Sequence, residues 1–325
     1  MKKRVLTPII VLFFCLAGLA DGATYRTKNF VVTTSDPLLA QQMAQRAEFL
    51  REDLAKFWLG KPLPNWFRRC KIKIRIGEYS PGGQTSFIFN NGEVYGWDME
   101  IQGTAQRVYD SVLPHEITHM ILASYFRRPV PRWADEGAAT FTEADPERKK
   151  YQNMLLKFLR TQKGIPLDQL FLMEEYPADP LPLYAQGFSI AEFLIRQRGP
   201  QYFVYFIERS MEPGASLRKL VLECYGYESL RELQGDWVAW VAEGSPSFIG
   251  SNLIADAENT VPVKEEVTLV SNTEPATPES FSASTTLATA QAESTYAQGE
   301  APVESKRVRP QPNLLMWTSS DMRNH

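Results

Sequence analysis

The stretch His115-Glu116-Ile117-Thr118-His119 constrains the fold most, because its chemistry requires a helix. On a helix, residues four positions apart lie on the same face, so two imidazoles with this spacing can bind one metal ion. The flanking residues favour a helix. Asp110 is a candidate N-cap, Pro114 would fall in the first turn, and an apolar pattern continues to Leu122.

Two imidazoles leave a catalytic zinc short of the three protein ligands that it normally has. A third candidate is Glu136, which lies in the stretch Arg132-Trp133-Ala134-Asp135-Glu136-Gly137-Ala138-Ala139. The small side chains at 137–139 would let this second helix approach the first closely. Glu136 is therefore the candidate third ligand beside His115 and His119.

These motifs, H-E-x-x-H followed by W-x-x-E-G-x-A, resemble the gluzincin metallopeptidases, and in particular the bacterial peptidase-MA-like family, over about residues 82–244. The resemblance implies that His115, His119 and Glu136 bind Zn²⁺ and that Glu116 is the general base. It implies hydrolysis of peptide bonds in a peptide or protein substrate by a zinc-activated water. It also implies a thermolysin-like core.

One departure from the family concerns the group that orients the metal-binding histidines. Several gluzincins have an acidic residue four positions after the ligand glutamate, whereas this chain has Thr140. An orienting carboxylate holds an imidazole in the tautomer that binds the metal. Asp135, Glu143 and Asp110 are the candidates, and each could instead be a capping or surface acid.

A second family element is Leu183-Tyr184-Ala185-Gln186-Gly187, which follows the metal ligands as a Y-A-Q-G stretch. Gluzincins use a tyrosine or histidine to stabilise the oxyanion of the tetrahedral intermediate, and the resemblance implies Tyr184 for that role. The alternative is an interior tyrosine bonded to a backbone carbonyl.

The N-terminus predicts export from the cytoplasm. Lys2-Lys3-Arg4 precede an apolar run to Ala20 that is too short and wrongly flanked for a stable membrane span, so residues 1–20 read as a signal peptide of a secreted or periplasmic protein. Removing those three cations changes the net charge from −3 to about −6, which argues against nucleic acid as a partner. Cys70 and Cys224 would remain, either as a disulfide or as two unpaired buried thiols.

The sequence between about 24 and 245 indicates one α+β peptidase domain, with a small mixed sheet (24–103) before a helical part (104–245). We expect this domain to be a monomer. Strands are expected at 29–35, 71–76, 85–89 and 93–102, and helices at 37–58, 147–163, 181–198, 202–211 and 227–243. The hairpin at 82–102 is the candidate edge that binds a peptide substrate as an added strand.

From residue 246 onward the sequence is rich in Ser, Thr, Ala, Glu and Pro, which predicts a disordered, low-complexity tail. The segments 306–309 and 314–317 could be docking motifs within it. The rival to an enzyme is a non-catalytic envelope binding or scaffold protein that uses zinc only for stability. Glu116 discriminates between the two, because structural zinc needs no general base.

Overall fold

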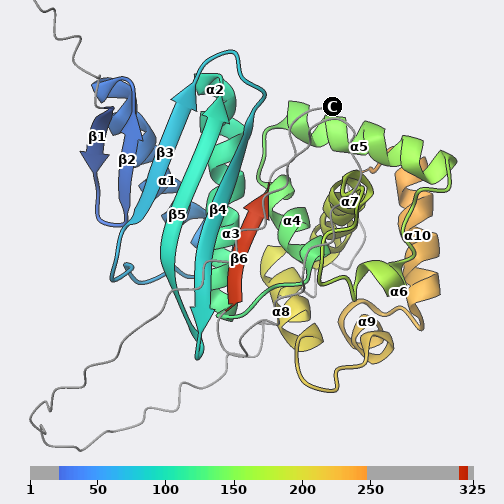
Figure 1. The fold of residues 1–325 in the computed structure, drawn as a ribbon. Coiled ribbons are helices and arrows are strands. Elements are labelled where there is room, and N and C mark those ends of the chain that lie inside the picture. The colour runs from blue at the N-terminus through green and yellow to red at the C-terminus, as the bar shows by residue number, and fades with distance from the viewer. Residues whose placement is uncertain (1–21, 247–314, 321–325) are drawn as a thin grey trace, which may run out of the picture. The chain divides into compact units, whose positions relative to one another are not determined.

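A mixed β-sheet forms the first half of the fold and helices form the second half (Figure 1). The computed structural model describes residues 22–246 and 315–320, all within one unit of the chain. The strand order is β1-β2-β3-β5-β4-β6. The strands are β1 (Ala23–Arg26), β2 (Phe30–Thr34), β3 (Cys70–Ile76), β4 (Gly82–Asn90), β5 (Glu93–Gly103) and β6 (Leu315–Ser320).

Parallel and antiparallel pairs occur together in this sheet. Strand β3 pairs in parallel with both β2 and β5, whereas β4 and β5 form an antiparallel hairpin. Along β3, the isoleucines at 72 and 74 are buried while the basic residues between them are exposed, as the alternating sequence predicts. The α+β class with a mixed sheet is therefore confirmed, although the sequence analysis missed β1.

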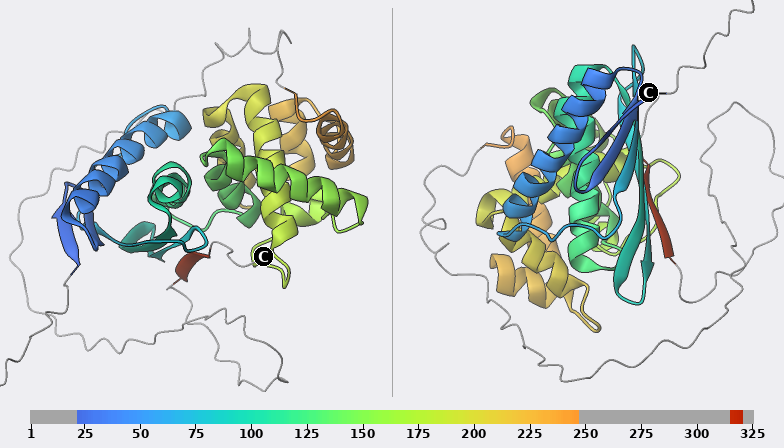
Figure 2. Two further views of the ribbon diagram at one scale, coloured as in Figure 1. Left: turned by 90° about the horizontal axis from the view of Figure 1, so that it is seen from above. Right: turned by 90° about the vertical axis from the view of Figure 1, so that its left-hand side faces the viewer.

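Helix α1 (Pro37–Leu59) and helix α3 (Leu113–Phe126) lie on the same face of the sheet (Figure 2). The Asp36 side chain accepts a hydrogen bond from the Leu39 N–H at 2.7 Å and caps α1, with Pro37 at the first helical position. Both helices bury apolar residues against the sheet, and α1 also contacts α3. The metal-binding motif therefore lies on a helix that is held from two sides.

The start of the motif helix differs from the prediction. The helical run begins at Thr104, whose hydroxyl accepts from Arg107 N–H, and passes through α2 (Ala105–Arg107) and a π-helical turn at Val108–Val112 before α3. Asp110 lies inside that turn and is not an N-cap. A proline ring clashes with the carbonyl four residues earlier, and the wide turn accommodates Pro114 within the helical run.

The helical lobe follows α3. Its helices are α4 (Arg132–Phe141), α5 (Asp145–Arg160), α6 (Leu167–Leu170), α7 (Leu181–Arg198), α8 (Pro200–Ser210), α9 (Leu217–Tyr225) and α10 (Leu230–Ala242). Helix α7 contacts α4, α5 and α8 and is buried along most of its length. The sequence predicted α5, α7, α8 and α10 with small shifts of their ends, but missed the short helices α6 and α9.

Close packing of α4 against α7 depends on two glycines. A Cβ added at Gly137 would lie 2.4 Å from the Gly187 carbonyl oxygen and 2.8 Å from the Ala191 Cβ. The sequence analysis expected small residues after Glu136 to serve the approach of α4 to α3. The structure corrects this for Gly137, which faces α7.

Three other expectations concern the cysteines, the membrane and the tail. Cys70 and Cys224 are both free and buried, so the structure contradicts the disulfide and favours the alternative of two unpaired thiols. Within residues 22–246, no helix combines the length and apolar character needed to cross a bilayer. Residues 315–320 form strand β6, which corrects the expectation of a wholly disordered tail. The predicted signal peptide and the rest of the tail lie outside the described residues.

The α4–α7 contact generates a stability prediction. Gly137→Ala should lower the free energy of unfolding by about 1–3 kcal/mol, because the new methyl group meets backbone that cannot move away cheaply. Urea denaturation of the chelator-treated protein measures this without a contribution from metal binding. Gly235→Ala on α10 is the matched control, since a Cβ there meets nothing within 4 Å and should be neutral or stabilising by up to ~1 kcal/mol. Equal effects of the two substitutions would contradict the close-packing argument.

Candidate metal centre

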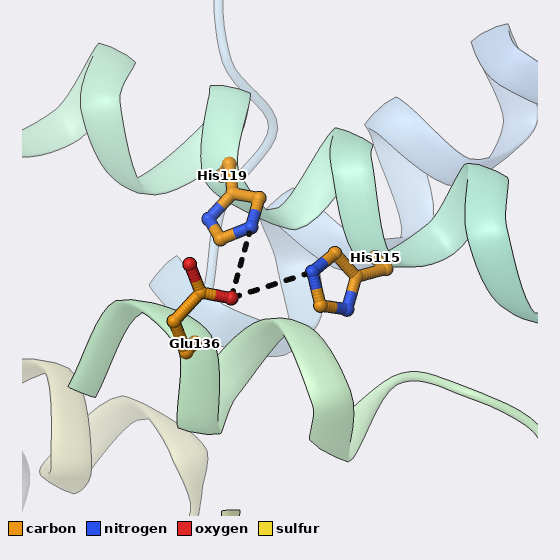
Figure 3. A group of neighbouring side chains, drawn as sticks. All are labelled: His115, His119 and Glu136. Atoms are coloured by element: carbon orange, nitrogen blue, oxygen red, sulfur yellow. Dashed lines mark ion pairs between the residues drawn. The ribbon is translucent and has the colours of Figure 1, made fainter. Parts of the chain in front are cut away.

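His115 and His119 lie one turn apart on the same face of α3, as the motif requires (Figure 3). Their ring centroids are 4.8 Å apart and both side chains are almost fully buried, with exposed fractions of 1% and 0%. Helix α4 packs against α3 and carries Glu136, whose carboxylate points between the two rings. The three residues predicted to bind metal are therefore neighbours in the structure.

The spacing of the ligand atoms fits a single metal ion. Glu136 Oε2 lies 3.6 Å from His115 Nε2 and 3.7 Å from His119 Nε2, and one ligand atom from each residue lies within 4.8 Å of the others. Both distances exceed an ordinary hydrogen bond. Zinc bonds of about 2.0–2.2 Å in tetrahedral geometry would place ligand atoms roughly 3.4 Å apart. Two imidazole nitrogens and one carboxylate oxygen are also a usual catalytic zinc donor set.

Two carboxylates orient the imidazoles. Glu143 Oε1 lies 2.7 Å from His115 Nδ1, and Asp135 Oδ1 lies 3.0 Å from His119 Nδ1. A carboxylate at Nδ1 favours the tautomer with its proton there, which directs the Nε2 lone pair to the metal position. Both acids are buried, whereas Asp110 accepts a hydrogen bond from Gln106 and does not contact the imidazoles. Of the three candidates left open by the sequence, two contact the histidines.

Glu136 is held on its other oxygen by Tyr176, which the sequence analysis missed. The Tyr176 hydroxyl donates to Glu136 Oε1, so Oε2 is the atom that faces the histidines. Burial, followed by the charge of Glu136, raises the pKa of Tyr176 well above its usual value, so this phenol remains a donor. Tyr176 lies in the loop between α6 and α7, 40 residues beyond Glu136, in a stretch without a motif.

Tyr184, the predicted oxyanion group, is fully buried on α7. Its ring stacks on Tyr176 at 6.2 Å between centroids and on Tyr151 at 6.5 Å. The structure thus places Tyr184 beside the tyrosine that donates to Glu136, and its role in stabilising an oxyanion stays a prediction.

The charges at the site also favour a divalent cation. Burial opposes ionisation of Glu136, but the charges of His119 and His115 outweigh it and lower the pKa of the carboxyl. Burial lowers the pKa of His119, and Asp135 and Glu136 together reverse that effect and raise it. A further carboxylate, that of Glu143, lies 2.7 Å from His115 Nδ1. The three acids beside the two imidazoles, Asp135, Glu136 and Glu143, carry excess negative charge, which is costly without a cation.

Strand β4 runs over Glu116, the predicted general base. Thr85 Oγ1 donates to Glu116 Oε2 at 2.6 Å, and a Cβ added at Gly83 would lie 2.3 Å from Glu116 Oε1. Thr85 therefore holds one carboxylate oxygen, and only glycine at position 83 leaves room for the other. Strand β4 of the hairpin at 82–102 contacts α3, and the role of the hairpin in binding a peptide substrate stays a prediction. Thr85 was not singled out from the sequence.

The arrangement fits a metal centre of the gluzincin type: two histidines and an intervening glutamate on one helix, with a glutamate from the next helix. No protein-family model and no curated protein matches the sequence. Two solved structures are similar, the M1 zinc metallopeptidase of Deinococcus radiodurans and a single-residue mutant of it.

Both of these likenesses are distant. The TM-scores are 0.33 and 0.34, with 17% sequence identity over 66% of this chain. The match spans 51% of the Deinococcus enzyme, about half its length. The assignment of the centre therefore rests on the residues of the site.

The carboxylates at Nδ1 generate a prediction on metal affinity. Asp135→Asn should weaken zinc binding by about 10–100-fold, because the neutral amide no longer stabilises the metal-binding imidazole of His119. Competition with a chromogenic chelator measures the dissociation constant. Asp110→Asn is the control and should leave it unchanged. An unaltered affinity in the Asp135 variant would show that this carboxylate does not support the ligand.

A second prediction concerns the two stacked tyrosines. Tyr176→Phe should weaken zinc binding by about tenfold, since it removes the hydrogen bond that fixes the Glu136 carboxylate. Tyr184→Phe, a change of the same size on the neighbouring ring, should leave metal affinity within about twofold of the wild type, because the role predicted for Tyr184 is to stabilise the oxyanion and not to hold a ligand. The same titration distinguishes them, and the reverse order of effects would assign ligand support to Tyr184.

Proposed function

We propose that this protein is a zinc-dependent metallopeptidase of the gluzincin type, similar to the bacterial peptidase-MA-like family, and that it hydrolyses peptide bonds outside the cytoplasm. The observation that carries the proposal is Glu116, a buried carboxylate that follows the ligand His115 on α3 and has Thr85 and Gly83 of β4 against it. The predicted signal peptide supports the location. The proposed substrate is a peptide or protein.

His115, His119 and Glu136 would hold the ion. When bound, zinc supplies a water with its pKa lowered to about 7 and polarises the scissile carbonyl. Asp135, Glu143 and Tyr176 keep the three ligand side chains in the required orientation. Each ligand thus has its own supporting group, which limits the rearrangement needed when the substrate binds.

Glu116 would act as the general base. Its carboxylate accepts the proton of the attacking water and then delivers that proton to the leaving amine. The Thr85 hydroxyl donates to Oε2 and thereby fixes the orientation of this carboxylate. Tyr184 is the proposed donor to the oxyanion.

A non-catalytic binding or scaffold protein is the rival. Three protein ligands leave a coordination position for water, which catalytic zinc sites keep and structural sites lack. A buried glutamate held by Thr85 beside the cluster has no role in a purely structural site. These observations support the enzyme over the scaffold.

Glu116→Gln tests the mechanism. The variant should fold and bind zinc as the wild type does, while cleavage of a broad fluorogenic peptide library falls by about 10²–10⁴-fold, since the amide cannot accept the proton. Turnover, metal content and thermal unfolding are measured together. Glu208→Gln changes a partly exposed glutamate of α8 that bonds Tyr125 and serves as the control, with activity retained. Equal activity of wild type and Glu116→Gln would reject the mechanism.

Metal removal provides an independent test. Dialysis against a chelator should abolish cleavage and lower the thermal unfolding temperature, because the buried acids lose their cation. Adding Zn²⁺ back should restore both. A protein that is purified free of metal, unfolds at the same temperature with and without zinc and cleaves peptides in chelator would not be a metallopeptidase.

A further inference from the structure

The outer edge of β4 is the part of the sheet nearest to the proposed general base. In a strand, alternate residues face the same side, and Gly83 and Thr85 both face Glu116. The backbone N–H and C=O groups of β4 lie in the plane of the sheet, perpendicular to those side chains. One row of these groups pairs with β5. The other row lies along the opposite edge of β4, the same stretch of strand whose Thr85 side chain bonds Glu116.

Strand β6 pairs with that edge. It runs antiparallel to β4, with Leu315 opposite Phe89, Ser319 opposite Thr85 and Ser320 opposite Gln84. Figure 1 shows β6 beside β4, between the sheet and the helical lobe, and the right-hand view of Figure 2 shows it along the same edge. The backbone of residue 319 therefore passes next to the residue that holds Glu116.

The sequence of this segment suits strand addition. Leu315–Ser320 reads L-M-W-T-S-S and contains neither a charged residue nor proline, in a tail rich in both. Aromatic and β-branched residues favour strands, whereas charges and prolines protect edges from pairing. An extended peptide paired with an exposed edge is also the way in which β-strand addition recognises a ligand, since the main chain supplies the hydrogen bonds.

We propose that the edge of β4 over Gln84–Phe89 is a peptide-binding surface that accepts one extended chain as an antiparallel strand, and that segment 315–320 of this same chain is its resident occupant. Because the segment is tethered, its pairing is intramolecular and needs little intrinsic affinity. The surface then takes a peptide in trans only after β6 has left. The predicted effect on turnover rests on the proposed function, because β6 and a peptide substrate would compete for the same edge of β4.

Two consecutive prolines introduced into the full-length protein test whether segment 315–320 occupies the edge of β4. The N–H groups of a strand point alternately to its two sides, so in the double variant Trp317→Pro and Thr318→Pro one of the two positions must lose an N–H directed at β4. The control is Glu304→Pro with Ser305→Pro, which lies outside the strand. Removal of residues 313–325 is a second route to the same edge and should act in the same direction.

Hydrogen exchange and peptide binding give readouts that need no activity. The amides at 84–89 should exchange at least tenfold faster in the double variant than in the wild type and the control, while those of α7 stay unchanged. A fluorescein-labelled peptide with the sequence of residues 313–321 should bind the double variant at least tenfold more tightly than the wild type, and a scrambled peptide should bind neither. Unchanged exchange at 84–89, or equal peptide affinity of variant and wild type, overturns the proposal.

Turnover separates this proposal from the proposed function. For a fluorogenic peptide, the double variant should show a KM at least fivefold lower and a kcat within twofold of the wild type. If exchange and binding change as expected but neither protein cleaves any peptide, the peptidase assignment fails and the surface stands. If both proteins cleave with the same KM and the labelled peptide does not distinguish them, the enzyme stands and the occupant is rejected.

Discussion

Helices α3 and α4 pack together around a cluster of two histidines and several carboxylates, which are residues that bind metal ions. Two imidazoles with almost no exposure lie against three carboxylates, those of Asp135, Glu136 and Glu143. Such a group would be costly in an apolar interior unless each member has a partner and the excess negative charge is balanced. One divalent ion at the point where Glu136 Oε2 faces the two Nε2 atoms meets both conditions.

The rest of the fold holds this cluster from two sides by close backbone approach. On the sheet side, Gly83 lets β4 pass so near to Glu116 that a methyl group would collide with the carboxylate. On the lobe side, Gly137 and Gly187 let α7 support α4 from behind. Different elements therefore fix the two glutamates. Helix α7 supports α4, which carries Glu136, whereas strand β4 lies against Glu116.

Helices, strands and turns that follow from neighbouring residues could be predicted well from the sequence. Contacts between residues far apart in the chain could not. Helix α1 with its Asp36 cap, the alternation of β3, the hairpin turn after β4 and the bounds of α7 all follow from local residue choice. Thr85 and Tyr176 could not be found in that way, because they reach Glu116 and Glu136 across 31 and 40 residues from a strand and a loop without a motif. The π-helical turn at Val108–Val112 escaped prediction because the apolar pattern does not distinguish it from an α-helical turn.

The proposed use of β4 as a peptide-binding edge would have a consequence for selectivity. A row of main-chain donors and acceptors senses the shape of a polypeptide more than the identity of its side chains, since every residue except proline offers the same pair of groups. A helical or already sheet-paired segment cannot satisfy that row, because its own amides are engaged. A site of this construction distinguishes unfolded from folded polypeptide before it distinguishes one sequence from another.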